Sequence, residues 1–224
     1  MLEIYKPIKR FFDIIFSLLA ILILSPILIP IVILLKLTGE GYILYFQKRI
    51  GYKSHYFNIW KFATMLKDSP NMGTGTITLR KDPRITPMGG FLRITKINEL
   101  PQLFNVLKGD MSFVGPRPLV DKNFSETPKE IKDKIYLNKP GITGIGSVVF
   151  RDEEKLISET KLPVEQFYNE VIGPFKCDLE IWYGKNISFL IDFKILMLTA
   201  LVILMPKATF YSTWFKDLPK AKGF

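Results

Sequence analysis

The chain has 224 residues, of which 48% are hydrophobic, and a formal net charge of +10 at pH 7. This length predicts one globular domain with appended segments, and the apolar residues suffice for a core with some left over for lipid. The positive charge predicts an anionic partner, and nucleic acid, an anionic membrane surface and a phosphorylated substrate all fit it. One histidine and one cysteine exclude multi-histidine metal sites and an intrachain disulfide, so acid, base and nucleophile chemistry falls mainly to carboxylates.

The single cysteine and the single histidine have modest expected roles. Cys177 is expected as a small core residue, and its solitary presence indicates a reducing setting. Ser54 and His55 form a weak candidate pair of nucleophile and base, because neighbours in a strand point to opposite faces.

Residues 14–35 form an uncharged apolar segment that, at about 1.5 Å per helical residue, is just long enough to cross about 30 Å of bilayer. Pro26 and Pro30 lie inside it, and basic residues lie on both sides of it. Because basic residues stay on the cytoplasmic side, we expect the segment to enter and leave the same leaflet, with Ser25 and Pro26 at its apex. A proline-kinked transmembrane helix is the alternative. The flanking basic residues are Lys6, Lys9, Arg10, Lys36, Lys48 and Arg49.

The next elements are predicted strands. Residues 42–47 and 55–62 are rich in β-branched and aromatic side chains, which predicts a β-hairpin with Gly51 in its turn. Beyond it, Asp82 and Arg84 bracket a proline in KDPRIT.

The stretch KINELPQLFNVLKGDMSFVGPRP, residues 96–118, predicts a short helix followed by a stiff loop. Asn98 is a suitable N-cap, Glu99 falls in the first turn, and Gly109 ends the helix. Capping alone explains the Asn98-Glu99 pair without any function. The predicted apolar face consists of Leu100, Leu103, Phe104 and Leu107.

The loop after this helix has the features of a phosphate site. Gly115 permits close backbone approach, and Pro116 and Pro118 stiffen the chain around Arg117, whose guanidinium can grip a phosphate through two parallel hydrogen bonds. A helix N-terminus, a fixed arginine and one or two carboxylates able to hold Mg²⁺ are the parts of a phosphoryl-transfer site. A solvated turn is the alternative.

Polar helices are predicted near residues 127–137 and 163–172, on either side of a turn in KPGITG. Farther on, residues 187–205 carry Asp192 and Lys194, which leaves an uninterrupted apolar stretch of 11 residues, too short to span a bilayer. An interfacial helix and a buried core helix both fit. In the final segment aromatic residues alternate with lysines, as expected at lipid headgroups, and a disordered basic tail is the alternative. These residues are Lys207, Phe210, Tyr211, Trp214, Phe215, Lys216, Lys220 and Lys222.

Taken together, these motifs resemble the bacterial sugar transferases, the monotopic phosphoglycosyl transferases of glycoconjugate assembly. The likeness runs from KRFFDIIFSLLAILILSP through QKRIG, WKFATM, DPRIT, ELPQLFNVLKGDMSFVGPRP and KPGITG to YGKNISFLIDFKILMLTAL. The resemblance implies transfer of a sugar 1-phosphate from a UDP-sugar to polyprenyl (undecaprenyl) phosphate, with Mg²⁺ as cofactor and UMP as leaving product. This would be the first membrane step of polysaccharide, O-antigen or glycoprotein assembly, at the cytoplasmic face of the bacterial inner membrane.

The resemblance also implies roles for particular residues. It places the phosphate-binding loop at Pro116, Arg117 and Pro118 with Gly115 beside it, adds Arg84 as a phosphate contact, and places the membrane break at Ser25 and Pro26. Glu99 and Asp110 are the expected magnesium ligands.

Two positions depart from the family pattern. Asn98 stands where the family has the nucleophilic aspartate of its Asp-Glu dyad, and Ala63 stands where the family has an arginine. A neutral amide is a poor nucleophile towards phosphorus and a weak magnesium ligand, so we expect Glu99 to do the carboxylate work.

The expected fold is α+β, a small globular domain with a β-hairpin and several helices. A re-entrant membrane helix is expected over residues 1–40, a cytoplasmic catalytic domain over 41–185, and amphipathic interfacial helices with a basic tail over 186–224. A catalytically silent protein that binds nucleotide sugar or polyprenyl phosphate, or a scaffold, is the competing hypothesis because of Asn98. A nucleic-acid partner is disfavoured because no recognisable module is present, and the oligomeric state, including a homo-oligomer, is left open.

Overall fold

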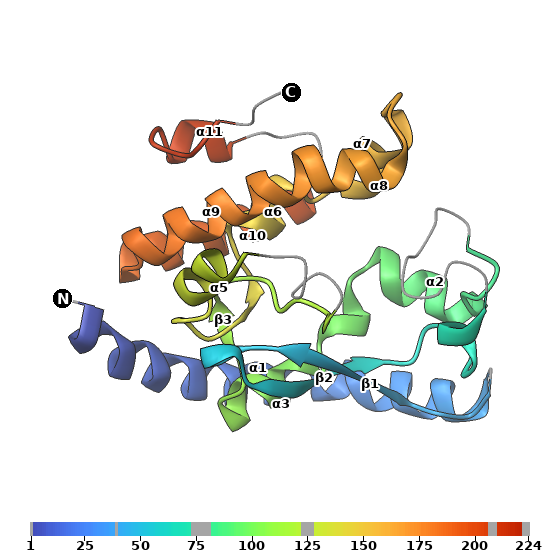
Figure 1. Ribbon diagram of the computed structural model, residues 1–224. Helices are drawn as coiled ribbons and strands as arrows, with labels where there is room; N and C mark the ends of the chain where they lie inside the picture. The colour runs from blue at the N-terminus through green and yellow to red at the C-terminus, as the bar shows by residue number, and fades with distance from the viewer. Residues whose placement is uncertain (1, 39, 73–81, 122–127, 206–209, 221–224) are drawn as a thin grey trace.

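The computed structural model describes residues 2–38, 40–72, 82–121, 128–205 and 210–220 and mixes helices with two small sheets. The elements are α1 (Leu2–Leu37), β1 (Leu44–Ile50), η1 (Tyr52–Ser54), β2 (Tyr56–Phe62), η2 (Ser69–Asn71), α2 (Pro87–Ile94), η3 (Ile97–Glu99), α3 (Gln102–Lys108), β3 (Ser112–Val114), α5 (Lys129–Ile135), β4 (Gly141–Thr143), α6 (Ile145–Val149), α7 (Glu153–Glu159), α8 (Val164–Phe167), the π-helix η4 (Tyr168–Ile172), α9 (Gly173–Asn186), α10 (Phe189–Leu204) and α11 (Tyr211–Trp214). In Figure 1, α1 and the β1–β2 hairpin lie along the lower side, α9 crosses the upper side, and β3 lies between them.

Helix α1 is 36 residues long and keeps its helical assignment through Pro7, Pro26 and Pro30. Its stretch Ile4–Leu37 is long and apolar enough to cross a membrane by length and composition. The sequence therefore predicted an apolar N-terminal helix correctly. The helical conformation continues across Ser25 and Pro26, where an interruption was expected.

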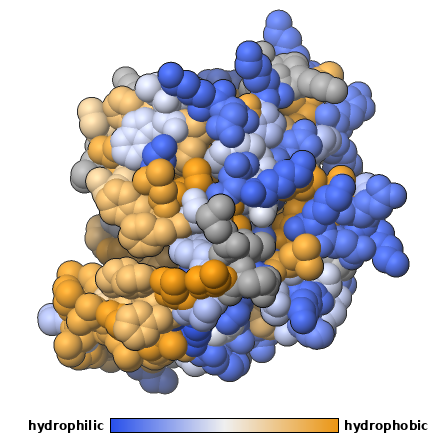
Figure 2. Space-filling model, turned by 90° about the vertical axis from the view of Figure 1, so that its left-hand side faces the viewer, coloured by the Kyte–Doolittle hydropathy of each residue, from blue (hydrophilic) through white to orange (hydrophobic). Residues whose placement is uncertain are grey.

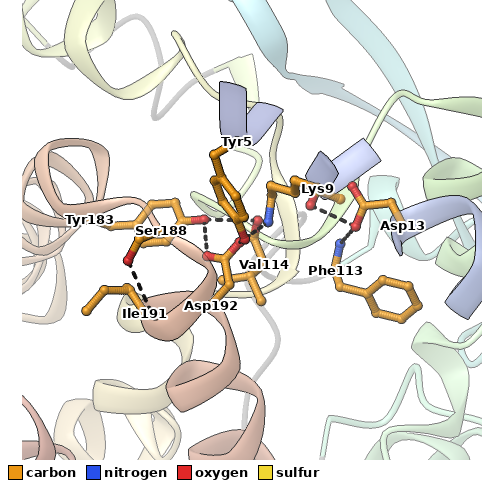
Figure 3. A network of polar contacts seen from close by, with 10 residues as sticks. Tyr5, Lys9, Asp13, Phe113, Val114, Tyr183, Ser188, Ile191 and Asp192 are labelled. Carbon is orange, nitrogen blue, oxygen red and sulfur yellow. Dashed lines mark hydrogen bonds and ion pairs between the residues drawn. The ribbon is translucent and has the colours of Figure 1, made fainter. Parts of the chain in front are cut away.

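Hydrogen bonds and an ion pair hold the N-terminal half of α1 against the rest of the domain (Figure 3). Asp192 of α10 accepts a hydrogen bond from the Tyr5 hydroxyl at 2.7 Å and pairs with the Lys9 ammonium group. Tyr183 of α9 donates to the other oxygen of the same carboxylate at 2.7 Å. Farther along α1, Asp13 accepts from the backbone N–H of Phe113 at 3.1 Å. An apolar helix thus carries a buried polar edge because these groups find partners on the domain.

The C-terminal half of α1 is packed on the domain through apolar contacts. Ile31 and Leu35 are buried together with Phe62 of β2 and Leu92 of α2. Since the polar contacts lie near one end of α1 and the apolar contacts near the other, the helix lies along the domain over most of its length.

The predicted hairpin is confirmed: β1 and β2 pair antiparallel, with Leu44 opposite Phe62 and Ile50 opposite Tyr56. Gly51 lies in the turn between the strands, as predicted. Gly51 has a φ of −129°, whereas the left-handed residues are Lys53 and Ser54, with φ of 53° and 59°.

The KPGITG segment was predicted as a turn, and this was wrong. Gly141–Thr143 forms β4, which pairs in parallel with β3. Three-residue strands carry too little alternation to be recognised from sequence. The polar helices that were predicted on either side of it are confirmed as α5 and as α8 with η4, and the latter continue directly into α9.

The main hydrophobic cluster joins β3, α6, α9 and α10. Ile195, Leu198 and Val202 of α10 are buried in it with Leu179 of α9. Helix α10 is therefore a core helix on one face, and it exposes other large apolar side chains on the rest of its surface. The exposed residues are Phe189, Leu190, Phe193, Leu196, Met197 and Ile203.

Candidate active site

A cleft with about 300 Å³ of empty space, open to solvent, lies where the hairpin, η3 and the β3–β4 pair meet. Its lining combines three cationic side chains, one carboxylate and one amide with a few apolar groups. The lining residues are Arg49, Ile59, Lys61, Glu99, Gln102, Arg117, Pro118, Gly141 and Ile142.

The hairpin supplies two of the cations by strand alternation. Ile59 and Lys61 are two residues apart on β2, so they point to the same side of the hairpin. Arg49 lies on β1 opposite Phe57, which shares that side with Ile59. The Arg49 guanidinium is fixed by Gln47, whose side-chain oxygen accepts at 2.6 Å from Nη2, and by the carbonyl of Pro118 at 3.1 Å from Nη1.

The loop that carries Arg117 is fixed by close backbone packing. The N–H of Gly115 donates to the carbonyl of Thr143 at 3.0 Å, and the N–H of Gly141 donates to the carbonyl of Pro116 at 3.0 Å. A Cβ on Gly115 would lie 2.2 Å from a backbone oxygen, so only glycine fits there. Arg117 itself is exposed and its guanidinium borders the cleft.

Glu99 is the carboxylate of the cleft. Its Oε1 lies 3.7 Å from the ammonium nitrogen of Lys61, and 27% of its side chain is exposed. Burial raises the pKa of Glu99, but Lys61, Arg117 and Lys96 together outweigh it and hold that pKa below its ordinary value. Glu99 is therefore an anion at neutral pH, as the sequence predicted.

The cations of the cleft repel one another. Burial, together with Arg117 and Arg49, lowers the pKa of Lys61 to about 8 against the attraction of Glu99. Burial and the facing Arg117 also lower the pKa of Arg49. Several positive groups around one carboxylate leave a net positive cleft, and an incoming anion relieves their mutual repulsion.

Asn98 was predicted as the N-cap of the helix, and this was wrong. It lies inside η3, whose N-cap is Lys96 in a left-handed conformation (φ 61°), and α3 begins only at Gln102. Asn98 is buried and is not among the residues that line the cleft. Its side-chain oxygen has no hydrogen-bond partner within the described residues.

The apolar face expected for α3 is also different. Leu103 and Val106 are buried, whereas Phe104 is 42% exposed. Phe104 stacks on Trp60 of β2, and Asn105 accepts a hydrogen bond from the Trp60 N–H at 2.9 Å. The helix therefore turns a mixed face towards the hairpin, because Asn105 satisfies the edge of β2. The predicted end at Gly109, which has a φ of 99°, is confirmed.

Arg84 lies outside the cleft. Its guanidinium is buried and donates to both oxygens of Asp82 at 2.8 and 2.6 Å, and to the carbonyls of Ser69 and Met72 at 2.9 Å each. The structure does not bring it together with Arg117. Within the described residues, Arg84 ties the start of α2 to the segment after β2.

Asp110 is not among the residues that line the cleft either. It follows α3 at the end opposite to Glu99, 3.3 Å from the exposed Lys108 ammonium group and 3.4 Å from the Asn105 amide. In the parts of the chain that the structure describes, no group of three or more histidine, cysteine, aspartate or glutamate side chains could hold a metal ion.

The remaining candidates are placed simply. Cys177 is free and partly buried, and burial raises the pKa of its thiol to about 11. Among the described residues, no side-chain hydrogen bond joins Ser54 to the exposed His55. Ala63 is buried near the C-terminal end of α1, away from the cleft that holds Glu99.

Sequence reasoning missed Arg49, Lys61 and Gln102 as members of the cleft. Arg49 and Lys61 lie in the QKRIG and WKFATM motifs, whose likeness to the family was noted without assigning a role to either cation. Strand alternation could have placed Lys61 on one side of the hairpin, but only the packing of η3 and the Arg117 loop determines which side forms a cleft.

Comparisons with known proteins identify the family of the chain. The family described as bacterial sugar transferase matches residues 4–206. An undecaprenyl-phosphate glucose phosphotransferase of Komagataeibacter xylinus is 46% identical over 158 residues, which is 65% of this chain and 30% of that protein. A UDP-N-acetylgalactosamine-undecaprenyl-phosphate N-acetylgalactosaminephosphotransferase of Aeromonas hydrophila is 34% identical over 203 residues, 90% of this chain and 44% of that protein.

A third relative is nearer in length, whereas the chain spans less than half of each of the first two. An exopolysaccharide production protein of Sinorhizobium fredii is 36% identical over 163 residues, 65% of this chain and 70% of that protein. The family match covers almost the whole chain, including the cleft and the helices around it. The chain belongs to the bacterial sugar transferase family.

Proposed function

We propose that this protein transfers a sugar 1-phosphate from a UDP-sugar to polyprenyl phosphate and releases UMP. The observation that carries the proposal is a cleft in which one ionised carboxylate, Glu99, lies among Lys61, Arg49 and Arg117. Family membership and the names of the relatives support transfer over the competing role of a silent binding protein.

The three cations suit a diphosphate bridge between a nucleoside and a sugar. Arg117 offers a planar fork of donors held by its flanking prolines, and Arg49 is already oriented by Gln47. In the transfer, the bond from the sugar-bearing phosphorus to the oxygen that bridges the two phosphates breaks. Negative charge then collects on the departing UMP. Cations fixed beforehand stabilise that charge without reorganising.

Glu99 serves either of two balanced routes. In the first, a Glu99 oxygen attacks the sugar-bearing phosphorus, UMP leaves, and a polyprenyl phosphate oxygen then displaces the carboxylate. In the second, Glu99 would be a ligand of the magnesium ion, the polyprenyl phosphate oxygen attacks that phosphorus directly, and UMP leaves in one step. Mass spectrometry of the protein mixed with donor alone separates them, because only the first route leaves a sugar phosphate on Glu99.

The donor set of the cleft fits a magnesium ion that is held mainly by substrate phosphates. Glu99 would supply the carboxylate, and Gln102, which donates a side-chain hydrogen bond to it, orients that carboxylate. A bound ion would neutralise phosphate charge. Asp110, predicted as a second ligand, stays outside this set unless the loop after α3 moves.

We also propose that α1 is re-entrant and that the protein is monotopic at the cytoplasmic face of the bacterial inner membrane. What supports this is that Lys9 near one end of α1 and Leu35 near the other both contact the same domain. A straight span would carry one end about 30 Å away from the domain. Ser25 and Pro26, between these contacts, would lie deepest in the leaflet.

The outer surface supports the same placement. Figure 2 shows the largest continuous group of apolar side chains at the left and lower left of this face, whereas polar side chains predominate on the right. Exposed large apolar residues are concentrated on α1 and α10, and Phe12 of α1 contacts Phe189 of α10 with 6.1 Å between ring centroids. A joint apolar surface of this kind suits the acyl region under the headgroups, so α10 would lie at the interface on its exposed face.

Labelling tests the topology. Ile4→Cys and Leu37→Cys, at side chains that are 70% and 78% exposed, are made one at a time in a Cys177→Ser background. A membrane-impermeant maleimide should reach both sites in inverted membrane vesicles and neither in intact spheroplasts. Opposite accessibility of the two sites would contradict the re-entrant path.

The activity test incubates the purified protein with Mg²⁺, undecaprenyl phosphate and a panel of UDP-sugars, and measures UMP. Release that depends on both substrates is expected with one of the donors, and none with any donor would contradict the proposal. Asn98→Asp, which restores the family's dyad, separates an active enzyme from a disabled one. A small change is expected if Glu99 does the carboxylate work, whereas a large gain from near zero would show that the natural side chain disables transfer.

A further inference from the structure

A buried carboxylate that the chemistry proposed above does not use contacts the backbone of the Arg117 loop. Glu180 on α9 is 8% exposed, and its Oε1 accepts a hydrogen bond from the backbone N–H of Arg117 at 3.4 Å. Its Oε2 is buried without a hydrogen-bond partner among the described residues. Such a group is costly to bury unless it holds something in place.

The sequence of the loop makes this hydrogen bond unusual. Pro116 and Pro118 have no backbone N–H, so the N–H of Arg117 is the one backbone donor of the tripeptide. It points inward to Glu180, while the guanidinium of the same residue borders the cleft. The hydrogen bond to Glu180 therefore fixes the backbone of Arg117, and the position of the backbone determines the direction in which the Arg117 side chain extends.

The surroundings of Glu180 leave little room for movement. Gly146 on α6 packs against it so closely that a Cβ there would lie 2.7 Å from Oε1. Burial raises the pKa of Glu180 to about 7, against the attraction of Lys176 and Arg117. The titratable and charged groups that act on it or feel its charge are Arg117 of the loop, Tyr136 after α5, and Lys176, Cys177 and Tyr183 of α9; α6 contributes none.

We propose that Glu180 is a positioning residue, which holds the backbone of Arg117 from behind so that the guanidinium faces the donor's phosphates. The catalytic part of this inference rests on the proposed function, whereas the contact itself can be tested without any activity. The ionised carboxylate makes a stronger hydrogen bond to the N–H than the protonated acid does. The Arg117 amide should therefore report the charge of Glu180.

Nuclear magnetic resonance tests the contact in full-length protein in nanodiscs. Protein labelled with ¹³C-proline and ¹⁵N-arginine gives a proline-to-arginine signal for each Pro-Arg pair, Pro83-Arg84 and Pro116-Arg117. Arg117→Lys removes one signal and so assigns it. The Arg117 amide proton should move downfield as pH rises through about 7, while the Arg84 signal serves as an internal control.

Two variants at α9 decide the outcome. Glu180→Gln keeps the shape and should leave the Arg117 amide independent of pH, whereas Asp178→Asn, at an exposed carboxylate two positions away, should leave the titration intact. An Arg117 signal that titrates unchanged in Glu180→Gln would overturn the proposal.

The functional consequence is measured as donor affinity. Glu180→Leu should weaken the binding of UMP by about tenfold, the size expected for losing one hydrogen bond that orders a binding group. Should this variant fail to fold, Glu180→Gln carries the test in a Lys61→Arg background, where the charge of residue 61 stays constant. Donor KM should then vary between pH 6 and pH 8 with Glu180 and stay constant with Gln. Wild-type UMP affinity in folded Glu180→Leu would overturn the positioning role even if the protein proved not to be a transferase.

Discussion

Two Pro-Arg pairs in this chain, Pro83-Arg84 and Pro116-Arg117, look equivalent in sequence and differ in space. Both arginines donate their backbone N–H to a carboxylate, Arg84 to Asp82 at 3.0 Å and Arg117 to Glu180 at 3.4 Å. Asp82 also accepts two hydrogen bonds from the guanidinium of Arg84, which is buried. Glu180 accepts a hydrogen bond only from the backbone N–H of Arg117, and Arg117 lines the cleft.

The difference shows what turns an arginine motif into a binding site. A carboxylate two residues away can accept backbone and side chain together and neutralise the pair internally. A carboxylate from a distant helix reaches the backbone from the far side and leaves the positive charge for a ligand. The predictions below test this contrast, from the largest expected effect to the smallest.

Asp82→Ala should produce the largest loss of stability, because it leaves the buried Arg84 guanidinium without its carboxylate. We expect a fall in melting temperature of the order of 10 °C, read by tryptophan fluorescence during heating. Donor binding by the folded fraction should stay unchanged, since Asp82 is not part of the cleft. An unaltered melting temperature would show that the ion pair between Asp82 and Arg84 has no structural role.

Gly115→Ala should disturb the Pro116-Arg117 pair, because Gly115 lies directly before it in the same loop. A Cβ there would lie 2.2 Å from the carbonyl oxygen of Lys139, so the loop must move, at a cost of about 1–3 kcal/mol. Denaturant unfolding measures this loss. Gly90→Ala is the matched control, because the nearest atom to its added Cβ is 3.9 Å away. Equal stability of the two variants would contradict the close packing.

Arg117→Lys should change donor binding, whereas Arg84→Lys should change stability. Replacing the planar fork at Arg117 by a point charge should raise the donor KM by about tenfold or more without lowering the melting temperature. The same change at Arg84 loses the bidentate contact to Asp82 and should lower the melting temperature while the donor KM stays the same. If both variants behave alike, the two pairs are not functionally distinct.

The pH dependence should give the smallest effect. Lys61 has its pKa lowered to about 8, so its positive charge is present below that pH and is lost as pH rises through it. Donor KM should therefore rise a few-fold between pH 7 and pH 9. In Lys61→Arg the guanidinium keeps its charge, and the rise should disappear. An identical profile in that variant would assign the change to another group.

Local patterns predicted the elements that are long or strongly patterned. The apolar helix α1, the hairpin and the end of α3 at Gly109 follow from residue type and spacing. The β3–β4 pair could not be foreseen, because backbone approach between Gly115 and Gly141 determines it and each strand has three residues. Parallel pairing of such short segments depends on tertiary contacts rather than on side-chain alternation.

The site was predicted in part for similar reasons. Glu99 and Arg117 meet in one cleft as expected, because both lie on segments whose backbone is fixed locally. Arg84 and Asp110 were grouped with them by motif, yet nearby partners, Asp82 and Lys108, hold their side chains elsewhere. Sequence shows which residues carry charge, whereas the choice between a neighbour and a ligand depends on three-dimensional distance.

The central claim is that Glu99 is the working carboxylate of the cleft. UMP release by Glu99→Gln, assayed with Mg²⁺, undecaprenyl phosphate and the preferred UDP-sugar, tests it most directly. Gln keeps the shape of the side chain and removes its charge, and the melting temperature checks that the variant is folded. We predict that UMP release falls to background in a folded protein. Full activity of folded Glu99→Gln would contradict this claim.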